Sequence, residues 1–218
     1  MRRIWNTFRL EFYTAKSVYP LLLVGLVIAG LLGIVRKPYV AALPIMVFAM
    51  FFGGTIWSIH ERNHSDKLFG VLPLRRNDVV IGRYMYGLAM GLFNLILGTI
   101  AIYVMWKATS ADMTVFTYLA ALSAGWLFYC LAVSISYPIY TRLSFSQAYI
   151  FTMLPFMILV IVCVYVLFKG NLEAVKQAFN YIIIHPVIMG CSAFGIGLLL
   201  LIVSCIISMQ LYRTKELS

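Results

Sequence analysis

Six uninterrupted apolar stretches constrain this chain more than any other feature of its sequence. They cover residues 18–35, 38–58, 84–106, 115–139, 147–168 and 186–211, and none contains an acidic or basic side chain. A helix needs about 20 apolar residues to cross the hydrocarbon core of a bilayer, which is close to the length of each stretch. Only 11% of the residues are charged, whereas soluble domains carry about 25%. We therefore predict one all-α membrane domain with six transmembrane helices.

The basic residues between the stretches divide unequally between the two sides of the membrane. One side carries Arg2, Arg3, Arg9, Lys16, Arg62, Lys67, Arg75, Arg76, Arg83, Arg142, Arg213 and Lys215, and the other carries Arg36, Lys37, Lys107, Lys169 and Lys176. Cytoplasmic loops are enriched in lysine and arginine. Both termini and residues 59–83 are therefore predicted to be cytoplasmic in a multi-pass membrane protein. The net charge of +10 is attributed to this bias and not to nucleic-acid binding.

Two flanking segments have an amphipathic pattern. In residues 1–17, apolar side chains recur at helical spacing between basic ones, at Ile4, Trp5, Phe8 and Phe12. This pattern predicts a helix on the cytoplasmic membrane surface, and charges at Arg9, Glu11 and Lys16 interrupt any apolar region of signal-peptide type. Residues 171–184 predict a similar external helix, with an apolar stripe at Leu172, Val175, Phe179 and Ile182. An ordinary amphipathic connector is the alternative for both.

The longest polar-rich segment is residues 59–78, "IHERNHSDKLFGVLPLRRND". It contains His60, Glu61 and His64 in the H-E-x-x-H spacing, which can place two zinc ligands and a general base on one helix. Such a site needs a third protein ligand. Asp66 follows His64 too closely to share its helical face, and the other acids lie across the membrane or require the loop to fold back. We predict no metal, and keep a membrane zinc metallopeptidase as the alternative function.

Polar residues within the six stretches are uncharged, which argues against ion-coupled transport. We expect them to bond to backbone or to a neighbouring helix: Thr55, Asn94, Thr99, Ser123, Ser134, Ser136 and Thr152. The Gly87-x-x-x-Gly91 pattern is interpreted as helix packing, and the four cysteines as buried small hydrophobes. No G-x-x-x-x-G-K-[ST] loop is present, so ATP cannot bind to this chain by that route.

The apolar run at residues 68–72 within the polar segment indicates contact with lipid or with a protein groove. "ERNHSDKLFGVLPLRRNDVVIGRYMYG" resembles the signature between the second and third spans of ABC type-2 exporter permeases. In the short six-span bacterial members, an acidic residue precedes a basic-apolar helix, a Leu-Pro pair, an arginine and a basic residue that opens the third span. The matching positions are Glu61, Lys67-Leu68, Leu72-Pro73, Arg76 and Arg83. The chain also resembles permeases of peptide exporters, such as those for phenol-soluble modulins.

This resemblance implies a function and a set of partners. The chain would be a non-enzymatic membrane subunit of a bacterial exporter of amphipathic peptides or other hydrophobic compounds. Two ATPase subunits would bind ATP and Mg, and a second permease chain would complete a homodimer or heterodimer. Residues 59–78 would form a coupling helix that docks on the ATPase through Glu61, His64, Lys67, Leu68, Leu72, Pro73, Arg75 and Arg76. A membrane interaction or immunity protein that transports nothing is a further alternative.

Overall fold

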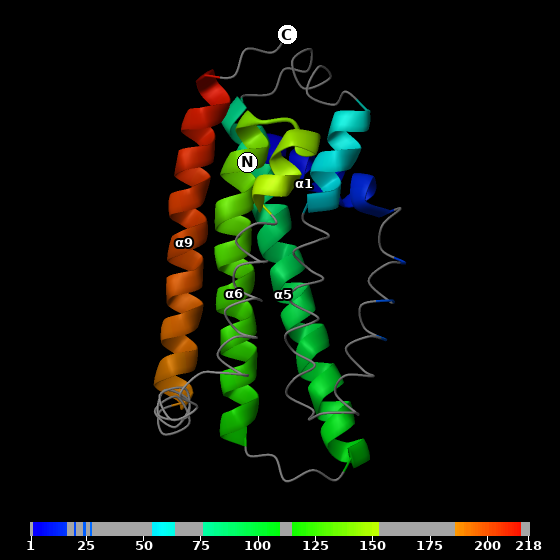
Figure 1. Cartoon of the computed structure of the whole chain (residues 1–218), viewed down its shortest axis with the longest axis vertical. Coiled ribbons are helices and arrows are strands. Elements are labelled where there is room, and N and C mark those ends of the chain that lie inside the picture. The colour runs from blue at the N-terminus through cyan, green and yellow to red at the C-terminus, as the bar shows by residue number, and fades with distance from the viewer. Residues whose placement is uncertain are drawn as a thin grey trace.

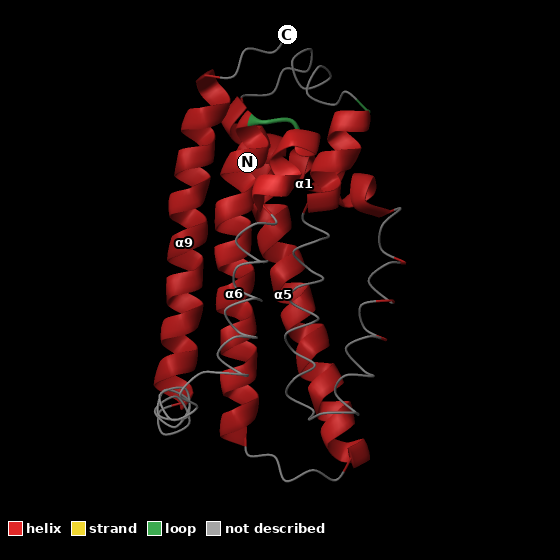
Figure 2. Ribbon diagram, in the orientation of Figure 1, coloured by secondary structure: helices red, strands yellow, loops and turns green. Residues whose placement is uncertain are grey.

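A computed structural model describes residues 2–16, 54–63, 76–109, 115–152 and 186–214, together with residues 20, 24 and 27. The helices in this part of the chain are α1 (Arg2–Ala15), α5 (Arg76–Thr109), α6 (Val115–Arg142) and α9 (Pro186–Thr214). Residues 54–62 and 145–152 are also helical. Figure 1 shows α5, α6 and α9 running along the long axis, while α1 lies across one end of them. No strand occurs within the described ranges (Figure 2).

Three of the described helices are long and apolar enough to cross a membrane. They are Arg76–Ala108, Tyr118–Arg142 and Gly190–Thr214, and they correspond to the predicted spans 84–106, 115–139 and 186–211. The predicted spans 18–35, 38–58 and 147–168 lie mostly outside the described residues, as does the predicted external helix at 171–184. The all-helical membrane architecture is therefore confirmed, while the number of six spans stays a prediction.

The helices on either side of the predicted 59–78 segment extend beyond the apolar stretches and into the segment. The helix before it continues to Arg62, although the span was predicted to end at Ser58. The helix after it begins at Arg76, although that span was predicted from Tyr84. A helix satisfies its own backbone hydrogen bonds and need not end where the apolar side chains end. Asp78 in the first turn of α5 also suits the positive end of the helix dipole.

The contact between α6 and α9 is the most extensive among the labelled helices. A Cβ atom placed on Gly197 of α9 would lie 2.7 Å from Nε1 of Trp126 and 2.9 Å from Sγ of Cys130, both on α6. The missing side chain at Gly197 therefore allows the two helices to approach closely. Three residues earlier, Phe194 stacks on Trp126 with ring centroids 4.8 Å apart.

Gly87 and Gly91 on α5 form a second close contact, with tyrosine rings of α6. A Cβ atom at Gly91 would overlap the ring of Tyr129, and one at Gly87 would lie 2.8 Å from the hydroxyl of Tyr137. The Tyr129 hydroxyl also donates a hydrogen bond to the Gly87 carbonyl at 2.5 Å. The interpretation of this G-x-x-x-G pattern as packing is confirmed, with aromatic rings occupying the space.

Four of the small polar residues named from the sequence, Asn94, Thr99, Ser123 and Thr152, bond to carbonyls of their own helices. Asn94 donates to the Met90 carbonyl and Thr99 to the Leu95 carbonyl, each at 2.8 Å, as expected from the sequence. The expectation is not met at Ser134 and Ser136, whose buried hydroxyls have no hydrogen-bond partner among the described residues. The prediction for the cysteines is only partly correct. Cys130 is buried, but Cys191 is exposed on α9 and Cys205 is half-buried, while Cys163 lies outside the described ranges.

Candidate functional site

The structure describes two of the eight predicted docking residues, one at each end of the 59–78 segment. These are Glu61 and Arg76. The others, His64, Lys67, Leu68, Leu72, Pro73 and Arg75, lie outside the described residues. The geometry at the two ends therefore defines how the segment is attached to the helix bundle.

Glu61 attaches the start of the segment to the helix at residues 145–152. Its carboxylate accepts hydrogen bonds from the backbone N–H and the hydroxyl of Ser146, each at 3.3 Å. Ser146 lies in the first turn of that helix, where backbone N–H groups lack partners within the helix and favour a negative charge. Glu61 is exposed to solvent, so this contact is weak compared with a buried one.

Arg76 attaches the end of the segment to the C-terminal turn of α9. Its Nη1 donates to the Arg213 carbonyl at 2.9 Å, and Arg213 in return donates from Nε to Oδ1 of Asn77 at 3.1 Å. The last carbonyls of a helix lack partners within it and favour a positive charge. The start of α5 is therefore attached to the end of α9.

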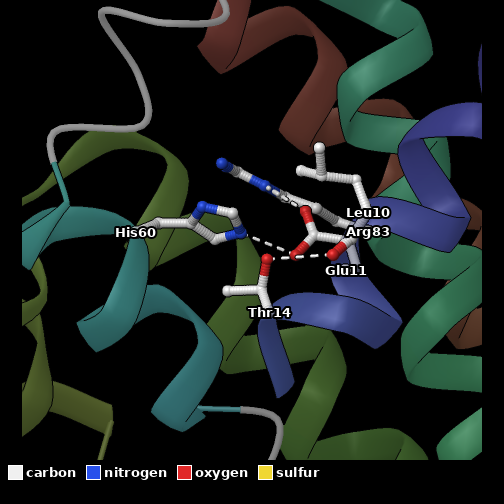
Figure 3. Close-up of polar contacts among 5 residues, drawn as sticks. All are labelled: Leu10, Glu11, Thr14, His60 and Arg83. Carbon is white, nitrogen blue, oxygen red and sulfur yellow. Dashed lines mark hydrogen bonds and ion pairs between the residues drawn. The ribbon is translucent and has the colours of Figure 1, made fainter. Parts of the chain in front are cut away.

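A buried cluster is centred on Glu11 of α1 (Figure 3). Nε2 of His60 lies 2.6 Å from Oε2 of Glu11, and Nε of Arg83 donates to Oε1 at 3.3 Å. Glu11, His60 and Arg83 have exposed fractions of 0%, 4% and 3%. One carboxylate thus binds a residue at the start of the 59–78 segment and a residue shortly after its end. We call Glu11, His60 and Arg83 the buried ion cluster.

Aromatic rings connect this cluster to the interior of α6. The guanidinium of Arg83 lies 4.2 Å from the ring centroid of Trp57, a cation–π contact that strengthens away from water. Trp57 packs against Tyr137 and Tyr140 of α6 at centroid distances of 5.8 and 5.7 Å. The start of α5 is therefore held by charge on one side and by aromatic packing on the other.

Helix α1 meets the bundle through a face that the sequence analysis did not identify. The buried positions are Thr7, Glu11 and Ala15, which follow at four-residue steps along one side of the helix. A Cβ atom on Gly82 of α5 would lie 2.8 Å from the Cβ of Thr7, so the two helices touch closely there. Trp5 belongs to the predicted membrane-facing stripe and is 53% exposed. The helix itself is confirmed, while its position on the membrane surface stays a prediction.

Sequence reasoning missed Glu11 as a functional residue, because its charge was taken only as an interruption of an apolar segment. A signal was present, since Glu11 is the only acidic residue before Glu61. It also lies one helical turn after Thr7 on the same face. A single acid in an otherwise basic helix is a candidate for a buried pair, but its partners are distant in sequence.

The H-E-x-x-H motif does not come together as a metal site in the described residues. Nε2 of His60 faces the Glu11 carboxylate, whereas Glu61 bonds to Ser146, and His64 lies outside the described ranges. No group of three His, Cys, Asp or Glu side chains that could hold a metal occurs among the residues described. Nothing in this part of the chain favours the zinc metallopeptidase.

Comparison with known proteins assigns most of this chain to one family. The family model described as ABC-2 family transporter protein matches residues 8–213, which includes α1, the buried ion cluster and all three candidate spans. No curated protein sequence matches the chain. The family implies a membrane permease that works with an ABC ATPase. This chain therefore belongs to the ABC-2 transporter family, as a multi-pass membrane permease.

Proposed function

We propose that this chain is the transmembrane subunit of an ATP-driven exporter and that a separate ATPase subunit docks on residues 59–78. Membership of the ABC-2 family supports the permease and the ATPase partner. ATP and Mg would bind on that partner, because the sequence has no G-x-x-x-x-G-K-[ST] loop. The predicted spans carry no charged side chain, which is compatible with amphipathic peptides or other hydrophobic compounds as substrates.

The buried ion cluster is the observation that carries this proposal. His60 lies at the start of the proposed docking segment and Arg83 follows its end, and both bind the same carboxylate on α1. Buried charged partners separate only at a large energetic cost. A displacement of the segment is therefore passed to the helices on both sides and to α1, instead of being absorbed by a flexible loop.

The proposed docking surface combines apolar anchors with charged contacts. Leu68 and Leu72 would enter a groove on the ATPase, while His64, Lys67, Arg75 and the exposed Glu61 and Arg76 would contact its rim. Pro73 would end the coupling helix, because proline lacks the N–H that a continuing helix needs. Rim charges steer association, whereas buried apolar groups hold the complex together.

The proposed assembly contains two permease chains, identical or similar, and two ATPase subunits in a bacterial cell membrane. Both termini and the docking segment would be cytoplasmic, as the distribution of basic residues predicts. The described helices support an apolar environment for substrates and lipids. Exposed apolar side chains continue along α5 and α9, at Phe93, Ile96, Ile100, Leu199, Ile202 and Ile206.

Co-purification in mild detergent tests this function. Tagged wild-type chain should retain an ATP-binding subunit identified by mass spectrometry. The double substitution Leu68→Ala/Leu72→Ala should lower the amount retained by about tenfold, the equivalent of about 1.4 kcal/mol. Ile100→Ala serves as the matched control, since Ile100 is an exposed apolar residue of α5 outside the segment. Absence of any ATPase with the wild-type chain would refute the function, and unchanged retention by the double variant would refute the docking surface.

A further inference from the structure

Helix α6 contains a proline, Pro138, in its interior. Proline has no backbone N–H, so the carbonyl four residues earlier, on Ser134, receives no hydrogen bond from within the helix. Inside a membrane no water is available to replace that bond, and another protein group must supply it. The helix nevertheless continues to Arg142. The partner of the Ser134 carbonyl therefore shows how the interruption is stabilised.

The missing bond is supplied by α9. The hydroxyl of Ser204 donates to the Ser134 carbonyl at 2.7 Å, and Ser204 is buried. A side chain of one helix thus replaces a backbone bond of another. This bond exists only while α6 and α9 stay together at this level.

The bond from Ser204 is part of a directed chain of hydroxyl groups. The Tyr84 hydroxyl of α5 lies 2.6 Å from Oγ of Ser204 and 2.8 Å from Oγ of Ser208. Each hydroxyl has a single hydrogen to donate, and that of Ser204 points to the Ser134 carbonyl. Tyr84 must therefore donate to Ser204, and Ser208 to Tyr84. The chain runs from α9 through α5 and back to α9 before it ends on α6.

Tyr84 links this chain to the buried ion cluster. It directly follows Arg83, whose guanidinium binds Glu11. Its ring also packs against Tyr137, the neighbour of Pro138, at a centroid distance of 5.1 Å. Movement at the start of α5 therefore shifts both the hydroxyl that holds Ser204 and the ring beside the proline.

The geometry points to Pro138 as a hinge in α6 that is closed by Ser204, with Tyr84 as the positioning residue that connects the hinge to the 59–78 segment. This inference rests on the proposed function for the source of the movement. Displacement of the segment moves Arg83 and Tyr84 together and withdraws the Tyr84 hydroxyl from Ser204. The bond between Ser204 and Ser134 then weakens, and α6 bends at Pro138 away from α9.

A double-mutant cycle tests the hinge without any partner protein. In the full-length chain in detergent, Ser204→Ala should lower the melting temperature by about 2–4 °C. Pro138→Ala restores the N–H that reaches the Ser134 carbonyl, so Ser204→Ala in that background should lose less than half as much. Ser123→Ala is the matched control, because the bond described for Ser123 runs to the Ala120 carbonyl of its own helix.

Two results would overturn the hinge. One is an equal loss from Ser204→Ala in both backgrounds, which would mean that the hydroxyl does not serve the proline interruption. The other is a loss no greater than that of Ser123→Ala in the otherwise wild-type chain. The second comparison holds even if Pro138→Ala fails to fold.

ATP turnover tests the role of the hinge in coupling. The complex co-purified with its ATPase is reconstituted in vesicles of phosphatidylethanolamine and phosphatidylglycerol. Pro138→Ala and Tyr84→Phe should retain the ATPase subunit, yet reduce turnover by roughly fivefold or more, since hinge substitutions change turnover. Unchanged turnover in both variants would overturn the coupling role. If the wild-type chain retains no ATPase, the proposed function fails, while the melting-temperature cycle still decides the hinge.

Discussion

Two carboxylates, Glu11 and Glu61, tie the 59–78 segment to the helix bundle, but Glu11 is buried and Glu61 is exposed to solvent. Glu61 is exposed and accepts two bonds of 3.3 Å from Ser146. Glu11 is fully buried and binds His60 at 2.6 Å and Arg83 at 3.3 Å. An exposed contact of this kind contributes about 0–1 kcal/mol, whereas removal of one member of a buried pair costs about 3–5 kcal/mol. The residue that holds the segment to the bundle is therefore Glu11, although the sequence motif highlights Glu61.

The largest expected effect is that of Glu11→Gln. This change removes the negative charge between His60 and Arg83 and leaves a buried cation without its carboxylate. We expect a loss of about 3–5 kcal/mol in the free energy of unfolding, measured by denaturation in mixed micelles. Glu61→Gln is the matched control. Equal losses for the two variants would show that burial does not distinguish the two carboxylates.

The next effect is that of His60→Phe, which keeps a ring of similar shape but removes the nitrogen that faces Glu11. The carboxylate then keeps Arg83 while losing its shortest contact. We expect a loss of about 1–3 kcal/mol by the same denaturation measurement. In the Glu11→Gln background the additional loss should be smaller, because the two residues share one interaction. Strictly additive losses would contradict a direct pair.

A comparable effect is expected from Gly82→Ala, which tests the contact between α1 and α5. The added methyl would lie 2.8 Å from two side-chain carbons of Thr7, and forcing extra volume into a packed contact costs about 1–3 kcal/mol. Gly195→Ala on α9 is the control, since nothing lies within 4 Å of the added atom. The thermal midpoint should fall for the first variant only. A similar midpoint for both would contradict a close approach of α1 and α5 at Gly82.

The smallest effect on stability is expected from Glu61→Gln, at about 0–1 kcal/mol. The same variant should weaken binding of the ATPase subunit, because the proposed docking surface includes Glu61. Retention of the ATPase in the co-purification assay measures this second effect. Unchanged stability together with reduced retention would show that Glu61 acts in docking, whereas Glu11 acts in the stability of the fold. Unchanged retention would remove Glu61 from the docking surface.

Sequence reasoning identified parts of the candidate site but not its centre. It marked Arg83 as a basic residue that opens a span after the segment and His60 as a possible metal ligand at the start of the segment. It did not pair either one with Glu11, because a separation of 49 positions between His60 and Glu11 has no local signature. The spacing rules for helices detect partners three or four residues apart.

The apolar stretches by themselves determined that this chain is an all-helical membrane protein with spans at α5, α6 and α9. Hydropathy suffices for this, because a helix in lipid must satisfy its own backbone bonds and present apolar side chains wherever it is placed. Only the tertiary structure decided which carboxylate is buried and which hydroxyl replaces the bond lost at Pro138. Ser204 and Ser134 are 70 positions apart. Their contact depends on how two helices pack, which no local pattern encodes.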